Sequence, residues 1–491
     1  MTEQNDFYVC LFKQPEKGGF FVGHAVSDID DFLPTAEKYS ESLAKDTSEV
    51  DDASRDPASE RFQKIFMEFA NSMMGFLEML PLIATIGRTI SRNVSSGAIK
   101  SYVARNGEQI RSDDQHEVYR LSIEKYPSYD SINQKRKNAT SLGKQIPKMM
   151  VLGVVSSFEH HISKLLKEIL NSRPEIINSK LIEITLKDLS DFDSIDSMKS
   201  HYIDSQIESV MRESFSKQID TVEKYLAIKS PIKNTYPGWE DLIELFERRN
   251  LFAHADGVVN KIYIGNVPAT KHSLGQALDV SPRYFSDSIV NLFEFGVKLI
   301  FVAWRRECKS DVENIDDDLG DFCYSLVEAK QYKLAEHLLE FSLNEAAPCK
   351  EKRRMMNIVN LANCYRLRNN QSKAEKTLDA VDWSAAGDEF QICVASVRGE
   401  VETVLRLMKV VSQDKVGAFA YENWPVFYKV RENEGFGKTF LEMFGRPYSP
   451  AAEDRHSFLE LMALVQEESE TQQKPQNLNS EPALVHDSSA A

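Results

Sequence analysis

The spacing of apolar residues predicts a mostly α-helical protein. Apolar positions recur every three or four residues through long stretches of the chain, which places them on one face of a helix. The densest stretch is residues 61–90, which Glu68, Glu78 and Pro81 interrupt. A membrane span needs about 20 mostly apolar residues with few charges. We therefore expect two buried helices here, with the break at Pro81.

Short extended segments are expected in two places. Phe7–Phe12 and Gly19–Val26 have the composition of strands, and Pro15–Gly19 supplies a turn between them. The pattern predicts a small N-terminal β-hairpin, followed by a short helix and an acidic linker over residues 28–60. Lys261–Gly265 is also predicted to be a short extended piece.

Two long helices are expected in the middle of the chain. Pro147 precedes a run of apolar residues at helical spacing, and proline is favourable in the first turn of a helix. This helix is predicted to end at Arg173-Pro174. Phe285–Trp304 is predicted to form another amphipathic helix.

The character of the sequence changes after Asp316. Two segments share a pattern of aromatic, small and leucine positions, with Ala335 and Ala374 at corresponding places 39 residues apart. The pattern resembles the paired helices of tetratricopeptide (TPR) repeats. A degenerate third unit is expected from Phe390 to Met408, followed by an aromatic cap.

These patterns predict five regions. In order, they are a β-hairpin and acidic linker (1–60), a helical region (61–143), a helical bundle (144–309), TPR-like helical repeats and cap (310–466), and a polar tail expected to be disordered (467–491).

Composition and charge narrow the class of protein. The formal net charge is −16, which excludes a protein that coats nucleic acid through a broad basic surface. Residues 310–491 carry 20 basic and 31 acidic residues, whereas residues 144–309 carry 22 of each and are neutral. The six cysteines lack a C-x-x-C spacing, which favours buried thiols in a reducing compartment over a zinc site. The N-terminus does not resemble a signal peptide, so we expect a cytoplasmic protein.

The best candidate for chemistry is Glu247–Gly257, at the end of a predicted amphipathic helix. Side chains four or five residues apart on a helix project from roughly the same side, so Arg249 and His254 are expected to face one small volume. Asn250 would lie beside the arginine. A histidine can transfer protons near neutral pH, and a guanidinium can hold phosphate oxygens. The alternative is that both residues only cap carbonyls at the helix end.

The sequence Arg249-Asn250-x-x-x-His254 resembles the R-x4-6-H motif of HEPN ribonucleases, including the polar residue after the arginine. The resemblance covers residues 144–309. It implies a small helical bundle that forms a homodimer, in which two copies of the motif meet and cut RNA without a metal or other cofactor. His254 would act as acid and base, Arg249 would bind phosphate, and Asn250 would bind or orient a ligand.

The resemblance has two further consequences. Arg248 also satisfies the motif spacing, but Arg249 is preferred because Asn250 follows it. Asp256 occupies the position at which HEPN toxins paired with a nucleotidyltransferase carry a tyrosine. Regulation through modification of such a tyrosine is therefore not expected.

Two other features of the sequence bear on this interpretation. Glu159 could orient the catalytic arginine, as acids do in that family, or it could pair with a lysine such as Lys164. The Lys135-Arg136-Lys137 cluster is either a solvated patch or a surface that steers RNA.

The leading prediction is a metal-independent endoribonuclease, regulated as a toxin or antiphage defence effector that cleaves cellular or phage RNA. Its TPR-like region would bind a protein trigger or inhibitor, and no stable membrane insertion is expected. The rival prediction is a non-catalytic dimeric scaffold that binds a protein or peptide through the TPR-like region.

Overall fold

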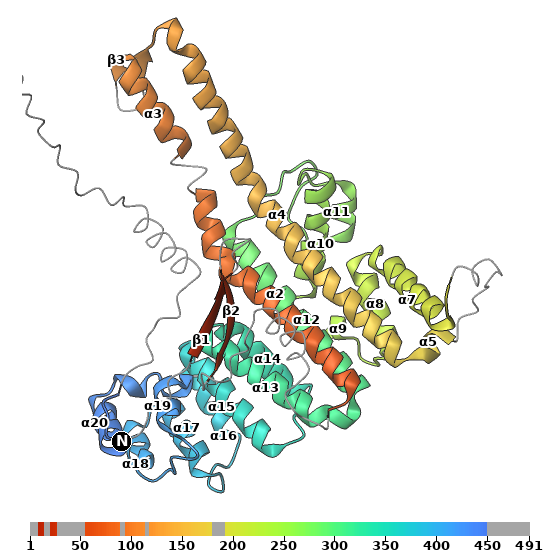
Figure 1. The fold of residues 1–491 in the computed structure, drawn as a ribbon, viewed down its shortest axis with the longest axis vertical. Helices are drawn as coiled ribbons and strands as arrows, with labels where there is room; N and C mark the ends of the chain where they lie inside the picture. Colours follow the sequence, from red (N-terminus) through yellow and green to blue (C-terminus); the bar gives the residue numbers. More distant parts are fainter. Residues whose placement is uncertain are drawn as a thin grey trace, which may run out of the picture. The chain divides into compact units, whose positions relative to one another are not determined.

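Helices dominate the described part of the chain, as the apolar spacing predicts (Figure 1). The structure is a computed structural model, and it describes residues 8–13, 20–26, 55–88, 94–112, 117–178 and 192–448. Most of the expected acidic linker and the expected disordered tail lie outside these residues. None of the described helices combines the length and apolarity needed to cross a membrane.

Strands form two small antiparallel hairpins. β1 (Tyr8–Lys13) pairs with β2 (Phe20–Val26), and this confirms the predicted N-terminal hairpin. A second hairpin joins β3 (Glu108–Ser112) to β4 (Glu117–Arg120). The second hairpin was not predicted, because its strands are short and polar.

Contacts divide the chain into two compact units, and each unit combines several stretches of sequence. The first contains residues up to Phe69, His160–Pro231 and Val297–Asp318, and the second contains Ala70–Glu159, Ile232–Gly296 and the chain from Leu319 onward. The candidate motif at residues 247–257 therefore belongs to the second unit.

Four helices contribute residues to both units: α2 (Pro57–Arg88), α4 (Tyr126–Ser172), α12 (Pro282–Glu307) and α13 (Val312–Glu328). The first unit also contains α5 (Pro174–Asn178), α7 (Ile195–Met211), α8 (Phe215–Tyr225) and the short η4 (Lys309–Asp311).

The second unit contains the remaining helices. Before Gly296 these are α3 (Val94–Asn106), η3 (Ile123–Lys125), α9 (Ile232–Thr235), α10 (Trp239–His254) and α11 (Lys261–Asn266). After Leu319 they are α14 (Tyr332–Asn344), α15 (Glu351–Leu367), α16 (Gln371–Asp379), α17 (Asp388–Arg398), α18 (Val401–Met408), α19 (Ala418–Asn423), η5 (Pro425–Phe427), η6 (Val430–Glu432) and α20 (Glu434–Phe444).

Prolines lie inside two helices where the sequence analysis expected a break or a start. α2 continues through Pro81, so residues 57–88 form one helix rather than a pair. α4 begins at Tyr126, 21 residues before the expected start at Pro147, and ends at Ser172 as expected. An internal proline removes one backbone hydrogen bond at a cost of about 3 kcal/mol. The apolar face of α4 after Pro147 is buried and offsets this cost.

Residues 261–266 form the short helix α11 rather than the expected extended piece. The Asn260 side chain caps this helix by accepting a hydrogen bond of 2.9 Å from the Tyr263 backbone N–H. An asparagine before an apolar run is a helix-start pattern, and the Ile and Tyr content obscured it.

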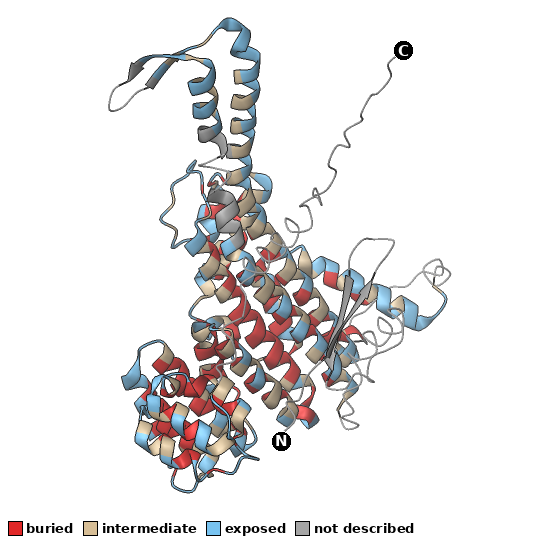
Figure 2. Cartoon of the chain, turned by 60° about the vertical axis from the view of Figure 1, so that its left-hand side comes forward, coloured by how far each residue is buried: buried red, intermediate tan, exposed pale blue. Residues whose placement is uncertain are grey.

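Aromatic residues are among the buried residues of each unit. Buried positions are red in Figure 2. In the first unit, Trp304 Nε1 donates a 2.7 Å hydrogen bond to Ser59 Oγ, and the Phe66 and Phe301 rings meet edge to face. In the second unit, the buried Phe158 ring lies 5.9 Å from the Phe246 ring, which joins α4 to α10.

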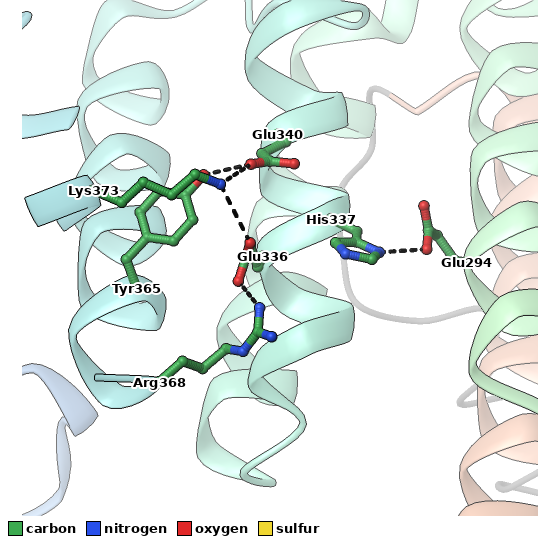
Figure 3. A network of polar contacts seen from close by, with 7 residues as sticks. All are labelled: Glu294, Glu336, His337, Glu340, Tyr365, Arg368 and Lys373. Atoms are coloured by element: carbon green, nitrogen blue, oxygen red, sulfur yellow. Dashed lines mark hydrogen bonds and ion pairs between the residues drawn. The ribbon is translucent and has the colours of Figure 1, made fainter. Parts of the chain in front are cut away.

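The C-terminal helices pack in sequence: α14 against α15, α15 against α16, and α17 against α18. α14 makes polar contacts in two directions (Figure 3). Towards α15 and α16, the carboxylates of Glu336 and Glu340 bind three side chains, those of Tyr365, Arg368 and Lys373. In the other direction, His337 Nδ1 lies 2.6 Å from Glu294 Oε2 of α12. The C-terminal helices are thus joined directly to the part of α12 in the same unit.

The cysteines agree with the expectation of buried thiols at four positions and not at the fifth. Cys308, Cys323, Cys364 and Cys393 are buried. Cys349 is exposed, because it lies in the loop between α14 and α15.

Candidate functional site

The candidate site is built on α10. This helix spans Trp239–His254, so it ends at the histidine of the motif as the sequence analysis expected. Leu242, Leu245 and Leu251 are buried, which fixes the side of the helix that faces the core. Glu240 and Asp241 in the first turn interact favourably with the helix dipole.

The end of α10 depends on a glycine. The backbone N–H groups of Ala255 and Gly257 both donate to the Leu251 carbonyl, at 2.8 and 3.0 Å. Gly257 has a φ of 82°, a conformation that side-chain-bearing residues rarely adopt. A Cβ atom there would lie 3.0 Å from the Phe252 ring and 3.1 Å from the Leu278 carbonyl oxygen. Glycine is therefore required both by conformation and by space.

Arg249 contacts Glu159, which lies on α4. An Arg249 guanidinium nitrogen donates to Glu159 Oε1, and the two side chains are 22% and 19% exposed. The guanidinium carbon also lies 5.8 Å from the centre of the Phe246 ring. Lys164, the alternative partner considered for Glu159, instead pairs with Glu68. The structure thus places Glu159 where it can orient Arg249.

The Arg249 guanidinium is only partly satisfied. Its Nε atom is buried and has no hydrogen-bond partner within the residues that the structure describes. A buried donor without a partner carries a desolvation cost of about 1–3 kcal/mol. Because Nε is buried, a further acceptor can approach the guanidinium only through the exposed part of the side chain, which is 22% exposed.

Asn250 and His254 lie on a different side of α10. Both are exposed, and neither forms a hydrogen bond or ion pair with any other described residue. They are four residues apart, so their side chains are about 40° apart around the helix axis, whereas Arg249 and His254 are about 140° apart. A five-residue step turns the second side chain away, so the expectation that Arg249 and His254 face one small volume within one chain stays a prediction.

Arg248 is bound elsewhere. Its Nε atom lies 2.7 Å from Glu244 Oε1, and its guanidinium carbon lies 4.0 Å from the centre of the Tyr284 ring. Tyr263 donates a 2.6 Å hydrogen bond to the same carboxylate. Burial and this hydrogen bond raise the pKa of Tyr263 to about 12. Arg248 is therefore part of a buried structural network, and its side chain is not available to a substrate.

A lysine of α4 binds the segment that follows the motif. Lys148 Nζ donates to the Asp256 backbone carbonyl at 2.9 Å and lies 3.2 Å from Asp256 Oδ1. The same amine lies 5.5 Å from the centre of the Phe252 ring. This contact could not be predicted from the sequence, since residues 108 positions apart have no spacing pattern that relates them.

Exposed apolar side chains follow the motif in the sequence. Ile262 on α11 is 68% exposed, and Leu274 in the next loop is 57% exposed. Val258 is exposed as well. Its backbone forms an isolated antiparallel bridge with Ala277, which follows Leu274 in the sequence. Exposed large apolar side chains are candidates for contacts with another protein.

A separate cavity of about 350 Å³ lies among α13, α15 and α17 of the second unit. Its lining includes Tyr324, Phe390 and Trp424, together with the polar side chains of Lys352 and Asn360. It belongs to the region in which the sequence analysis expected TPR-like repeats.

No family model matches this chain. Neither a curated protein nor a solved structure matches it either. The likeness to HEPN ribonucleases therefore depends on the motif residues and their surroundings.

Proposed function

We propose that this protein is a metal-independent endoribonuclease of the HEPN type. The observation that carries the proposal is the Arg249–Glu159 contact, which joins the motif helix to α4 and leaves part of the guanidinium without an acceptor. A carboxylate that holds an arginine in place while leaving donors free is suited to binding an anion whose charge increases during a reaction.

The proposed reaction is an internal transfer at a phosphodiester. His254 removes the proton from a ribose 2′-hydroxyl, and the 2′-oxygen attacks the adjacent phosphorus. The bond from phosphorus to the 5′-oxygen breaks, and that oxygen takes up a proton from an imidazolium or water. Arg249 binds the non-bridging oxygens as their negative charge grows. The products are a 2′,3′-cyclic phosphate and a 5′-hydroxyl.

Two copies of the chain are proposed to complete the site. Within one chain, His254 is exposed on a different side of α10 from Arg249, and one histidine cannot supply both proton transfers at once. The exposed Val258, Ile262 and Leu274 provide an apolar surface close in sequence to His254. A homodimer formed through this surface would bring a second His254 to the site.

The test is RNA cleavage by purified full-length protein in the presence of EDTA. Wild-type protein is expected to cut total RNA, and the His254→Ala and Arg249→Ala variants are expected to lose cleavage while keeping wild-type circular dichroism. Folded variants that cut RNA at the wild-type rate would show that the site is misassigned. Cleavage that stops in EDTA and returns with a divalent cation would rule out the metal-independent mechanism.

We also propose that the protein is a regulated toxin or antiphage effector, and that the 310–466 region controls its nuclease activity. The observation in favour is the cavity among α13, α15 and α17, which has aromatic walls and a few polar groups as binding sites for partners do. Filling it by Asn360→Trp is expected to change toxicity in cells, and the same change combined with His254→Ala should be harmless. Unaltered toxicity of a folded Asn360→Trp protein would contradict control through this cavity.

A further inference from the structure

The basic residues of α4 stand out in an acidic protein. Residues 131–158, between Asp130 and Glu159, contain four lysines and one arginine but no aspartate or glutamate, although the whole chain carries a net charge of −16. The basic residues are Lys135, Arg136, Lys137, Lys144 and Lys148. The first half of α4 is largely exposed, as its colour in Figure 2 shows.

Three of these residues lie along one side of the helix. Lys137 and Lys144 are seven residues apart and Lys144 and Lys148 are four apart, so their directions differ by only about 20–40° around the axis and their spacings are about 10 and 6 Å. We call Lys137, Lys144 and Lys148 the basic track. Asp130 is on the same side of α4, N-terminal to all three.

The basic track leads to the candidate site. Lys148 binds the backbone carbonyl of Asp256, two residues after His254. Glu159, the partner of Arg249, is 11 residues beyond Lys148, which places it on the same side of α4 about 16 Å further along. The continuity of α4 through Pro147 is what aligns the track with the site.

The two track lysines further from the candidate site are available to a ligand. Lys137 and Lys144 are exposed, and neither has a hydrogen-bond or ion-pair partner among the residues that the structure describes. Tyr126 is 11 residues before Lys137, on the same side of the helix, and is 58% exposed. A row of cations with an accessible aromatic ring is the combination that binds single-stranded nucleic acid through phosphates and base stacking.

We propose that the basic track binds the backbone of single-stranded RNA and directs it to Arg249 and His254. This inference rests on the proposed ribonuclease function and names the surface that holds the substrate. Single-stranded RNA is favoured over an acidic protein because the cations lie along one side of one helix and are accompanied by the exposed Tyr126. The track is narrow, so it is compatible with the overall negative charge.

The first experiment measures binding separately from cleavage. Full-length His254→Ala protein is titrated with a short unstructured RNA at several salt concentrations, with and without Lys137→Gln and Lys144→Gln. The matched control pair is Lys125→Gln with Lys135→Gln. Both control lysines are exposed, and Lys135 points about 160° away from Lys137 around α4.

Loss of two phosphate contacts should reduce the slope of log K against log salt by about 1.4 and should weaken binding about 20-fold near 0.1 M salt. The control pair should have a much smaller effect. Equal effects of the two pairs would overturn the proposal, because binding would then reflect diffuse attraction. Equally tight, track-dependent binding of polyglutamate would also overturn it and would identify an acidic protein as the ligand.

The second experiment separates failure of the track from failure of the nuclease. In the active protein, Lys137→Gln with Lys144→Gln should lower kcat/KM for a long RNA by a similar factor and leave cleavage of a dinucleotide unchanged, since a dinucleotide is too short to reach Lys144. If the parent binds RNA through the track but cuts nothing, the proposed nuclease function fails and the track stands. If the parent cuts long RNA and the substitutions have no effect, the track fails.

Discussion

Arg249 and Glu159 are 90 positions apart in the sequence and bind one another between α10 and α4. Both side chains are about one-fifth exposed, so the pair is neither fully buried nor freely solvated. Such a pair contributes about 1 kcal/mol or less to stability. Its main consequence is that it fixes the direction of the guanidinium, and Glu159 is therefore a positioning residue for the proposed reaction.

The first prediction concerns this positioning. Glu159→Gln is expected to lower kcat for RNA cleavage by about 100-fold, because a displaced catalytic group loses alignment with the phosphate. The melting temperature should change little, and Glu159→Asp should restore part of the activity. The measurement is steady-state cleavage of a labelled RNA, with kcat and KM determined separately.

The matched control is Glu68→Gln. This change breaks the ion pair between Glu68 on α2 and Lys164, which lies on α4 as Glu159 does. Cleavage by this variant should equal that of the wild type. A Glu159→Gln protein with unchanged kcat would show that the carboxylate does not position Arg249 for catalysis.

The second prediction concerns assembly. The wild-type protein is expected to have twice the chain mass of 55.9 kDa, and Ile262→Asp is expected to give monomers, because a charge would be placed in the proposed apolar interface. Light scattering at micromolar concentration measures this directly. Ile195→Asp is the control, since Ile195 is similarly exposed, at 64% against 68%, but lies on α7 in the first unit.

Loss of the dimer should be accompanied by loss of RNA cleavage if the second copy supplies a histidine. A fully active Ile262→Asp monomer would contradict the composite site. A wild-type protein that remains monomeric with RNA bound would contradict the proposed dimer itself.

The sequence predicted the mostly helical fold and the end of α10, but not the β3–β4 hairpin, the helix α11 or the contacts between distant residues. The extent of α10 and its stop near Gly257 follow from the spacing of Leu242, Leu245 and Leu251 and from a glycine in the correct place. The course of α4 through Pro147 could not be read locally, because it depends on tertiary burial that compensates for the missing backbone hydrogen bond.

In the candidate site too, some features could be predicted from local sequence and others depend on tertiary packing. The motif residues are recognisable from their spacing, but the choice of Glu159 between Arg249 and Lys164 depends on which helices pack together. The convergence of Arg249 and His254 stays a prediction, because side chains five residues apart on a helix diverge by about 140°.

The third prediction concerns the thiols. Iodoacetamide should modify Cys349 in the folded protein well before the buried thiols of Cys308, Cys364 and Cys393, because the thiolate is the reactive form. Burial raises the pKa of each of these three thiols to about 12, so they remain protonated near neutral pH. Peptide mass spectrometry gives the order of labelling. Rapid modification of the three buried cysteines in native protein would contradict their placement.

The fourth prediction compares two glycines with the same backbone conformation. Gly257 and Gly275 both have a φ of 82°, so alanine at either position pays a conformational cost of about 1–3 kcal/mol. Their surroundings differ: a Cβ atom at Gly257 would lie 3.0 Å from the Phe252 ring, whereas nothing lies within 4 Å of one at Gly275. Gly257→Ala should therefore lower the free energy of unfolding more than Gly275→Ala, as measured by urea denaturation.

Because Phe252 also contacts Lys148, the Gly257→Ala change should disturb the end of α10 and reduce RNA cleavage, while Gly275→Ala should leave cleavage close to wild type. Equal losses of stability in the two variants would mean that the end of α10 accommodates a side chain, and that Gly257 is needed for its conformation alone.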